Sequence, residues 1–175
     1  MLCALIILAV VVADQVSKAI VVAKLDMGES TGFIPYILSF CRSENTGMAW
    51  GMLKNHRWVF LTLSIVALVG FGILYYKTKK PHLLYTISMA FILGGGVGNM
   101  IDRLFRQGVN TTQNAVVDFL KFEFIDFPIF NVADAFITVG TVLIFVYLLF
   151  YDKKQEYPLF FDVKKEEKAD EQADI

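Results

Sequence analysis

Asp118 and Asp134 are two carboxylic acids that stand in apolar surroundings, in the blocks VVDF at 116–119 and FNVAD at 130–134. Two carboxylates brought together in a weakly solvated site cannot easily both ionise, so they tend to share one proton. The ionised member can take a proton from water, while the protonated member donates a hydrogen bond to a scissile carbonyl and later protonates the leaving amine. If the fold brings them together, the pair is a candidate for amide hydrolysis.

Asp134 also has a purely structural interpretation. Asn131 stands three residues before it and can cap a helix, and an acid in the first helical turn complements the helix dipole. The expected position of Asp118 on the same side of a membrane, at the same depth, favours the catalytic interpretation. Both interpretations stay open at this point.

Further charges stand inside or beside apolar runs, where each one costs at least about 2.5 to 3.5 kcal/mol on insertion scales. Asp14 and Lys18 are four residues apart, so they share one face of a helix and can pair there. One interpretation is that they support a functional site. The alternative is that they only neutralise each other in a packing contact.

A glycine-rich block, GGGVGNMIDR at 94–103, ends another apolar run. Small residues allow a second helix or a substrate backbone to approach closely. Asn99, Asp102 and Arg103 follow at helical spacing, so an amide, a carboxylate and a guanidinium are expected to converge there. The alternative is a helix end that an Asp–Arg pair stabilises.

Long apolar runs predict the elements that position these groups. The chain is 56% hydrophobic and 19% charged, whereas a soluble domain has about 45 to 50% and about 25%. The runs 58–76 and 83–101 each suffice to cross a bilayer core of about 30 Å, and 135–151 suffices if its helix begins a turn earlier. The first run, 1–13, resumes after Asp14 and Lys18 and is extended to about residue 23. A cleaved signal peptide is disfavoured because no Lys or Arg precedes this run.

The fold class is therefore predicted to be a mainly α membrane protein with four transmembrane helices and small extended or β segments in two outer loops. These loops, about 24–57 and 102–134, are too long for simple connections. In the second, Leu120, Phe122 and Phe124 alternate with charged residues and share the parity of Asp118, as in a strand with one buried face. In the first, 33–40 is expected to be extended.

The basic residues favour one orientation. Lysines are dense at 77–80 and 153–154, which favours cytoplasmic N- and C-termini and places the two long loops outside. The charged run 152–175 lacks apolar spacing and is expected to be a disordered cytoplasmic tail. Residues 1–151 then form a four-helix transmembrane domain.

Other chemistries have less support. The formal net charge of −1 comes with no basic surface for nucleic acid. His56 and His82 are predicted on opposite sides of the membrane, so they form no zinc cluster and no Ser-His-Asp triad. Cys3 and Cys41 are too few for a disulfide framework. We therefore expect no metal, no cofactor and no nucleic-acid partner.

Five polar blocks, taken in order, resemble lipoprotein signal peptidase, also called signal peptidase II. They are DQVSK at 14–18, NTGMAWG at 45–51, GGGVGNMIDR at 94–103, VVDF at 116–119 and FNVAD at 130–134. The resemblance covers about residues 1–151. It implies an aspartyl endopeptidase that removes the signal peptide of prolipoproteins, cutting before a cysteine that carries diacylglycerol. It also implies that Asp118 and Asp134 are the catalytic pair. The positions that it implies as lining or supporting the site are Asp14, Lys18, Asn45, Gly47, Asn99, Asp102, Arg103 and Asn131.

The expected partners follow from this resemblance and from the composition. They are prolipoprotein signal peptides carrying diacylglyceryl-cysteine, which enter sideways from membrane lipid, and Asn99 and Asn131 are expected to donate hydrogen bonds to their backbone. The expected location is the bacterial cytoplasmic (inner) membrane, with several passes, the active site near the outer face, and a monomeric state.

A proton-coupled transporter or channel is the alternative function, because such proteins also use intramembrane acids. A transporter needs ionisable groups spread across the depth of the bilayer. Asp102, Asp118 and Asp134 are instead expected together at the outer ends of the spans, and no convincing internal repeat is present.

Overall fold

The computed structural model describes residues 1–46, 57–78, 81–109 and 114–151. This part contains four helices, α1 (Leu2–Lys24), α2 (Arg57–Lys77), α3 (Leu83–Phe105) and α4 (Val132–Phe150). It also contains three strands, β1 (Ser30–Ile34), β2 (Leu38–Asn45) and β3 (Val116–Phe122). The predicted mainly α fold with small β segments is confirmed. The predicted tail, 152–175, lies outside the described residues.

Three of the helices, α1, α3 and α4, are long and apolar enough to cross a membrane. In α2 the apolar stretch Leu61–Lys77 is shorter, so the fourth span stays a prediction. Large apolar side chains are exposed along the helices, among them Leu8, Leu63 and Phe145. A helix surface of this kind is stable against hydrocarbon but not against water, which agrees with a membrane protein.

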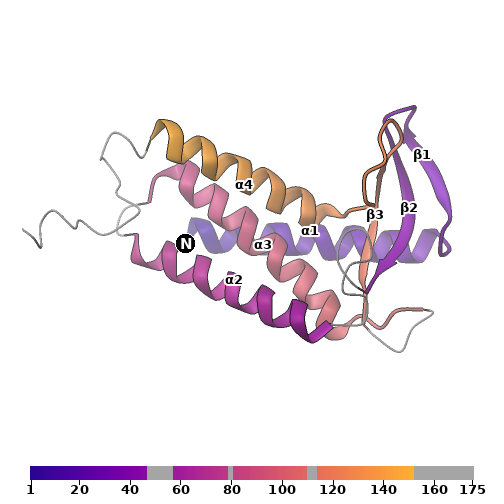
Figure 1. The fold of residues 1–175 in the computed structure, drawn as a ribbon, viewed down its shortest axis with the longest axis horizontal. Helices are drawn as coiled ribbons and strands as arrows, with labels where there is room; N and C mark the ends of the chain where they lie inside the picture. Colours follow the sequence, from indigo (N-terminus) through magenta and orange to yellow (C-terminus); the bar gives the residue numbers. More distant parts are fainter. Residues whose placement is uncertain (47–56, 79–80, 110–113, 152–175) are drawn as a thin grey trace, which may run out of the picture.

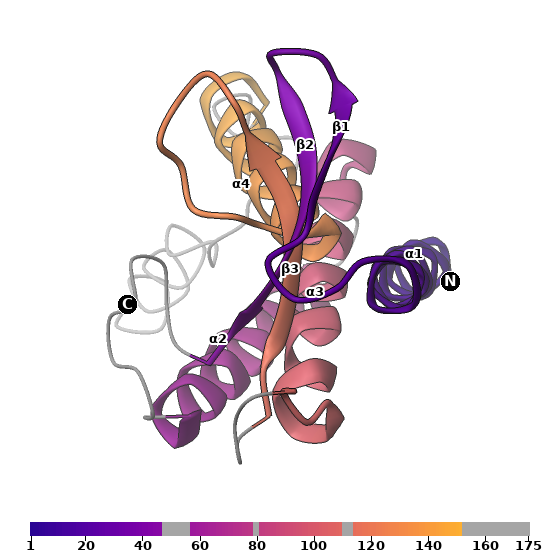
Figure 2. The same ribbon diagram turned by 90° about the vertical axis from the view of Figure 1, so that its right-hand side faces the viewer.

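Helix α3 is the centre of the bundle and contacts each of the other three helices (Figure 2). Its glycines make this packing close: a Cβ on Gly94 would lie 2.8 Å from Cβ of Val10 in α1, and one on Gly95 would lie 2.4 Å from the carbonyl oxygen of Ala133 in α4. Neither position has room for a side chain. The glycine-rich block therefore serves close helix packing on two sides of α3.

The sheet stands across one end of the bundle, and the N-terminus lies at the other end (Figure 1). Its order is β1-β2-β3, with both pairs antiparallel. The extended structure expected at 33–40 is present at 33–34 in β1 and at 38–40 in β2, but the chain turns at 35–37 between them. Pro35 is the first residue of the turn, and Tyr36 adopts a positive φ of 63°. The backbone N–H of Ile37 donates a hydrogen bond to the carbonyl oxygen of Ile34, as in a type II turn.

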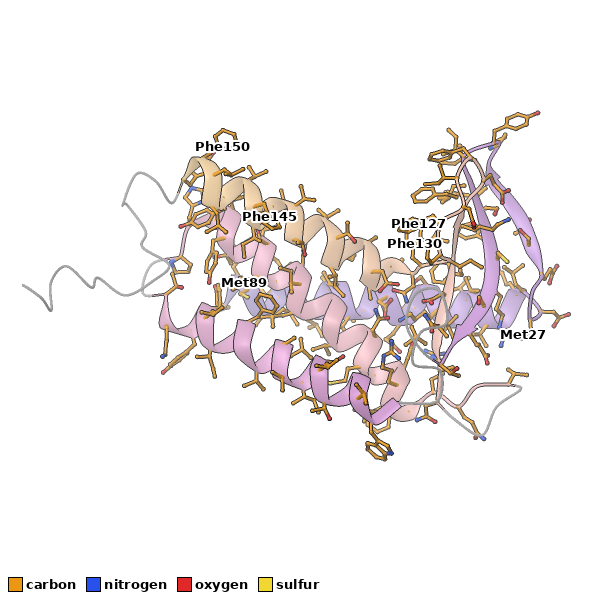
Figure 3. All side chains as sticks on the ribbon, viewed as in Figure 1. Met27, Met89, Phe127, Phe130, Phe145 and Phe150 are labelled. Atoms are coloured by element: carbon orange, nitrogen blue, oxygen red, sulfur yellow. The ribbon has the colours of Figure 1, made fainter. Side chains whose placement is uncertain are left out.

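Strand β3 has two buried faces near its start and a half-buried end. Val117 and Phe119 pack with Val21 of α1, while Asp118 lies on the opposite face with Leu120 and Phe122. Phe124 lies beyond the end of the strand and is exposed, contrary to the expected pattern. The rings of Phe127 and Phe130, both near Phe122, lie at the sheet end of the molecule (Figure 3). The sheet thus brings Asp118 to the end of the bundle.

Candidate active site

Asp118 and Asp134 reach the same end of the bundle from different elements. β3 carries Asp118, whose side chain is only 4% exposed, and Asp134 lies in the first turn of α4. Each oxygen of Asp118 accepts a hydrogen bond from an amide: Oδ1 from Nδ2 of Asn131 at 2.6 Å and Oδ2 from Nδ2 of Asn45 at 3.1 Å. Hydrogen bonds of this kind hold a carboxylate in one orientation.

Asn131 connects the two acids. Its side-chain oxygen accepts a hydrogen bond from the backbone N–H of Asp134 at 3.0 Å, and its backbone N–H donates to Oδ2 of Asp134 at 3.1 Å. The two hydrogen bonds form a capping box. The predicted helix cap is therefore confirmed. The cap accounts for one oxygen of Asp134 and leaves its other oxygen to the polar site.

Asn99 donates a hydrogen bond to that other oxygen of Asp134. Its Nδ2 donates to Oδ1 of Asp134 at 2.7 Å, and its Oδ1 accepts from Nδ2 of Asn131 at 3.0 Å and from Nζ of Lys18 at 2.9 Å. Both amide hydrogens of Asn131 are used, one on Asn99 and one on Asp118. Asn131 therefore hydrogen-bonds both acids, and its expected contact with substrate backbone stays a prediction.

Lys18 is fully buried, and each of its three ammonium protons has an acceptor. They are Oδ2 of Asp14 at 2.9 Å, Oδ2 of Asp102 at 2.8 Å and Oδ1 of Asn99 at 2.9 Å. The predicted Asp14–Lys18 pair is confirmed, and the ammonium does more than neutralise Asp14. A buried cation is tolerated only when it is paired and fully hydrogen-bonded.

Two residues of this network lie outside the predicted set. Arg106 donates to Oδ1 of Asp102 at 2.8 Å and to Gln15 at 3.1 Å. Gln15 in turn donates to Asp14 and Asp102. The four-residue spacing of Asp102 and Arg106 is a signal that identifies this pair in the sequence. The two acids Asp14 and Asp102 are thereby balanced by two cations, Lys18 and Arg106.

Asp14 connects this network to α4. Its Oδ1 accepts from the backbone N–H of Ala133 at 3.0 Å, next to Asp134. Gly98 makes room for this carboxylate, because a Cβ there would lie 2.6 Å from Oδ2 of Asp14. The position of Asp14 therefore sets the position of the first turn of α4.

The expected convergence of Asn99, Asp102 and Arg103 is only partly seen. Asp102 pairs with Lys18 and Arg106. Arg103 is half-buried, and its charge interacts with Asp118, Asp134 and Asp102. Because residues 102 and 103 differ by about 100° around a helix, they face different neighbours.

The pKa of Asp118 is raised to about 7. Burial is the main cause, and the nearby charge of Asp134 adds to it, while hydrogen bonds from Asn45 and Asn131 and the charge of Lys18 lower the pKa. An acid with this pKa is half protonated at neutral pH. Asp118 can therefore hold a proton beside Asp134 where an ordinary carboxyl could not.

Of the remaining predicted residues, Asn45 donates a hydrogen bond to Asp118, and Gly47 lies outside the described residues. Over the described ranges, no group of three or more His, Cys, Asp or Glu side chains is arranged to hold a metal ion.

A family model described as signal peptidase (SPase) II matches residues 6–150. The chain belongs to the signal peptidase II family. Among curated relatives, the lipoprotein signal peptidase of Bacillus velezensis is 38% identical over 160 residues, covering 89% of this chain and 99% of the relative. The lipoprotein signal peptidase of Listeria monocytogenes serotype 4b is 42% identical over 155 residues, covering 86% and 94%.

Solved structures share the fold of this chain. Two structures of a bacterial membrane enzyme, at 2.3 Å and 1.9 Å resolution, superpose with TM-scores of 0.77 and 0.75, each at 32% identity. They cover 88% and 85% of this chain and 90% and 93% of their own chains. The family match begins within α1 and extends to the last residue of α4, so every described residue of the site lies within the peptidase family's region.

Proposed function

We propose that this chain is an intramembrane aspartyl endopeptidase that removes the signal peptide from diacylglyceryl-modified prolipoproteins, cutting before the lipidated cysteine. The observation that carries this proposal is that Asn131 hydrogen-bonds both Asp118 and Asp134, so a buried and a half-buried carboxyl group are held in one site. The relatives named lipoprotein signal peptidase support the choice of substrate.

The charges around the pair support a single shared proton. Asp14 and Asp102 are balanced by Lys18 and Arg106. Among the described residues, the cations whose charges act on Asp118 are Arg103 and Lys18, and Lys18 is already shared between Asp14 and Asp102. Two ionised carboxylates would leave one uncompensated negative charge in a buried site, which is costly. One proton on the pair removes it, and the raised pKa of Asp118 supports placing that proton on Asp118.

The mechanism follows from this proton. Asp134, ionised, takes a proton from a water molecule whose oxygen attacks the scissile carbonyl carbon, while Asp118 donates its proton to the carbonyl oxygen. Asp134 then passes its proton to the amide nitrogen as the C–N bond breaks. The hydroxyl of the tetrahedral intermediate returns a proton to Asp118. The net reaction consumes one amide and one water and restores both acids.

The position of the site fits a substrate that is itself held in the membrane. The acids lie where the bundle meets the sheet, at the end opposite the N-terminus (Figure 1). We assign this end to the outer face of the bacterial inner membrane, with four spans over residues 1–151, cytoplasmic termini and a monomeric protein. Each CH₂ of the acyl chains contributes about 0.8 kcal/mol on transfer from water to the bilayer, so these chains keep the lipidated cysteine in the membrane that contains the site.

The transporter alternative gains no support from the described residues. The buried ions Asp14, Lys18 and Asp102 form one network that joins the acid pair through Asn99 and the first turn of α4, instead of a series of separate charges along the helices. A path for protons across the membrane needs ionisable groups at successive depths.

The test uses the purified full-length chain in detergent with one prolipoprotein in two forms, with and without diacylglycerol on its cysteine. The expected result is cleavage of the lipidated form alone, with the lipidated cysteine as the new N-terminal residue by mass spectrometry. Equal cleavage of both forms, or a cut at another bond, would refute the assigned specificity. Proton uptake by the chain in liposomes, without cleavage, would favour the transporter.

A further inference from the structure

Strand β2 contains a bulge directly before the residues that face Asp118. Phe40 pairs with Leu120 of β3, but the next pair is Ser43 with Asp118, so β2 uses three steps where β3 uses two. An extra residue of this kind changes which side chains face each side of the sheet from that point on. After the bulge, Asn45 shares the face of Asp118 and its amide reaches the carboxylate at 3.1 Å.

Arg42 lies in this bulge and joins it to α1. Its Nη1 donates to the carbonyl oxygens of Val22 at 3.2 Å and Leu25 at 2.9 Å, at the C-terminal end of that helix. Helix carbonyls there have no partner within the helix, and a cation complements the dipole. The side chain is buried, with 9% exposed. Arg42 therefore fixes the bulge to the end of a membrane-spanning helix.

The backbone of Arg42 is fixed as well. Its N–H donates to the carbonyl oxygen of Glu29 at 3.1 Å, and its carbonyl oxygen accepts from the N–H of Gly28 at 2.9 Å. Both partners belong to the short connection between α1 and β1. The bulge is thus attached to α1 through the side chain and through this connection.

Glu44 joins the same segment to the chain after α3. Its Oε1 accepts from Nη2 of Arg42 at 3.4 Å, and its Oε2 accepts from the backbone N–H of Val109 at 2.7 Å. Glu44 lies between Ser43 and Asn45, on the face of β2 away from Asp118. If the register slipped by one residue, a carboxylate in place of the Asn45 amide would face Asp118.

We propose that Arg42 and Glu44 are positioning residues that clamp the β2 bulge to α1 and to the chain after α3, and so hold the Asn45 amide on Asp118. This inference rests on the proposed function, in which Asp118 is a catalytic residue. Neither side chain is within hydrogen-bonding distance of either acid among the contacts of the described residues, so their effect passes through Asn45.

The first experiment is a double-mutant cycle on prolipoprotein cleavage with Arg42→Ala, Asn45→Ala and the double variant. Arg42→Ala and Asn45→Ala are each expected to lower kcat about tenfold with little change in KM. The kcat of the double variant is expected to be little lower than that of either single variant. Both single variants lose a hydrogen bond that lowers the pKa of Asp118, so the limb of the pH profile that reports this acid moves to higher pH in both. Arg42→Lys keeps a donor for the carbonyls of α1 and is expected to restore part of the rate.

Glu44→Ala provides a second route if Arg42→Ala does not fold. The matched control is Glu123→Ala, since Glu123 is an acid at the far end of β3 that bonds Ser39 and Lys121, and it is expected to leave rate and pH profile unchanged. Full additivity of Arg42→Ala with Asn45→Ala, or a loss of rate without a shift of the pH profile, would overturn the clamp. Equal effects of Glu44→Ala and Glu123→Ala would do the same.

A measurement without turnover separates this inference from the proposed function. The side-chain amide NMR signals of Asn45 are expected to titrate near pH 7 in the unmodified chain, and this titration is expected to vanish in Asp118→Asn and to weaken in Arg42→Ala and Glu44→Ala. An unchanged titration in both clamp variants would refute the positioning role. If the chain cleaved no prolipoprotein but the titration behaved as expected, the clamp would stand and the function would fall.

Discussion

Nδ2 of Asn131 lies 2.6 Å from Oδ1 of Asp118, so the residue that caps α4 also holds the carboxylate of β3. The cap and the acid are 13 residues apart in the chain. The same side chain accepts from the N–H of Asp134. The stability of one helix end and the geometry of the two acids, Asp118 and Asp134, are therefore joined in one residue.

The two roles of Asn131 can be separated by substitution. Asn131→Ala removes the cap and both amide donors, and loss of the cap alone costs about 1 kcal/mol. Asn131→Ser keeps an oxygen for the N–H of Asp134 but has no amide for Asp118 or Asn99. We expect the Tm of Asn131→Ser to lie closer to that of the unmodified chain than the Tm of Asn131→Ala does. Cleavage of prolipoprotein by Asn131→Ser is expected to stay at least about tenfold slower than by the unmodified chain. Joint recovery of both quantities would show that the amide contacts are dispensable.

Asp118→Asn and Asp134→Asn are each expected to reduce cleavage about 10³-fold or more, because a shared proton needs both carboxyl groups. The matched control is Asp126→Asn, an exposed acid in the segment between them, which is expected to cleave normally. The measurement is initial rate on the lipidated prolipoprotein, together with thermal unfolding of each variant. Substantial turnover by either folded variant would remove that acid from the mechanism.

The pH dependence follows from the protonation of Asp118. As pH rises through about 7, Asp118 loses the proton that it donates to the carbonyl oxygen, so kcat/KM is expected to fall with an apparent pKa near that value. The profile is measured over pH 5 to 9 on the lipidated substrate, with buffer and detergent held constant. A rate that stays level to pH 9 would contradict this role.

The same pKa predicts the pH dependence of stability. The pKa of Asp118 in the folded chain, about 7, lies above its ordinary value of 3.8. As pH rises between these two values, Asp118 is deprotonated in the unfolded chain but still protonated in the folded chain, so the free energy of unfolding falls. The loss is at most about 4 kcal/mol and is complete above the folded pKa. The Tm of Asp118→Asn minus that of the unmodified chain is therefore expected to increase from pH 4 to pH 8. A constant difference would show that Asp118 titrates normally.

Gly98→Ala tests the support beneath the site. The added Cβ would lie 2.6 Å from Oδ2 of Asp14, so the carboxylate must move away from Lys18 and from the N–H of Ala133. We expect a lower Tm and slower cleavage. Gly72→Ala in α2 is the control, because nothing lies within 4 Å of its added Cβ, and it is expected to keep activity and Tm or raise Tm slightly. Equal behaviour of the two variants would exclude a role for this close contact.

Local relationships were predictable because helix geometry imposes them. Residues four apart share a helix face, so Asp14 with Lys18 was expected and Asp102 with Arg106 could have been. Likewise, an Asn before an apolar run caps a helix, as Asn131 does. The turn at Pro35 and Tyr36, by contrast, divides a segment that reads as one extended run. Pro35 was the unused signal, because proline favours the second position of a type I or type II turn.

The sequence by itself determined that this chain is an apolar, mainly helical membrane protein of the signal peptidase II family, with Asp118 and Asp134 as its leading candidates for catalysis. Only the tertiary structure decided which partners these acids have. Lys18 bonds Asn99 across 81 positions, and Asn45 bonds Asp118 across 73, through a bulge that no local pattern signals. The physical reason is that helical and strand periodicities order side chains over a few residues, whereas contacts between elements depend on how glycine-lined helices and the sheet pack.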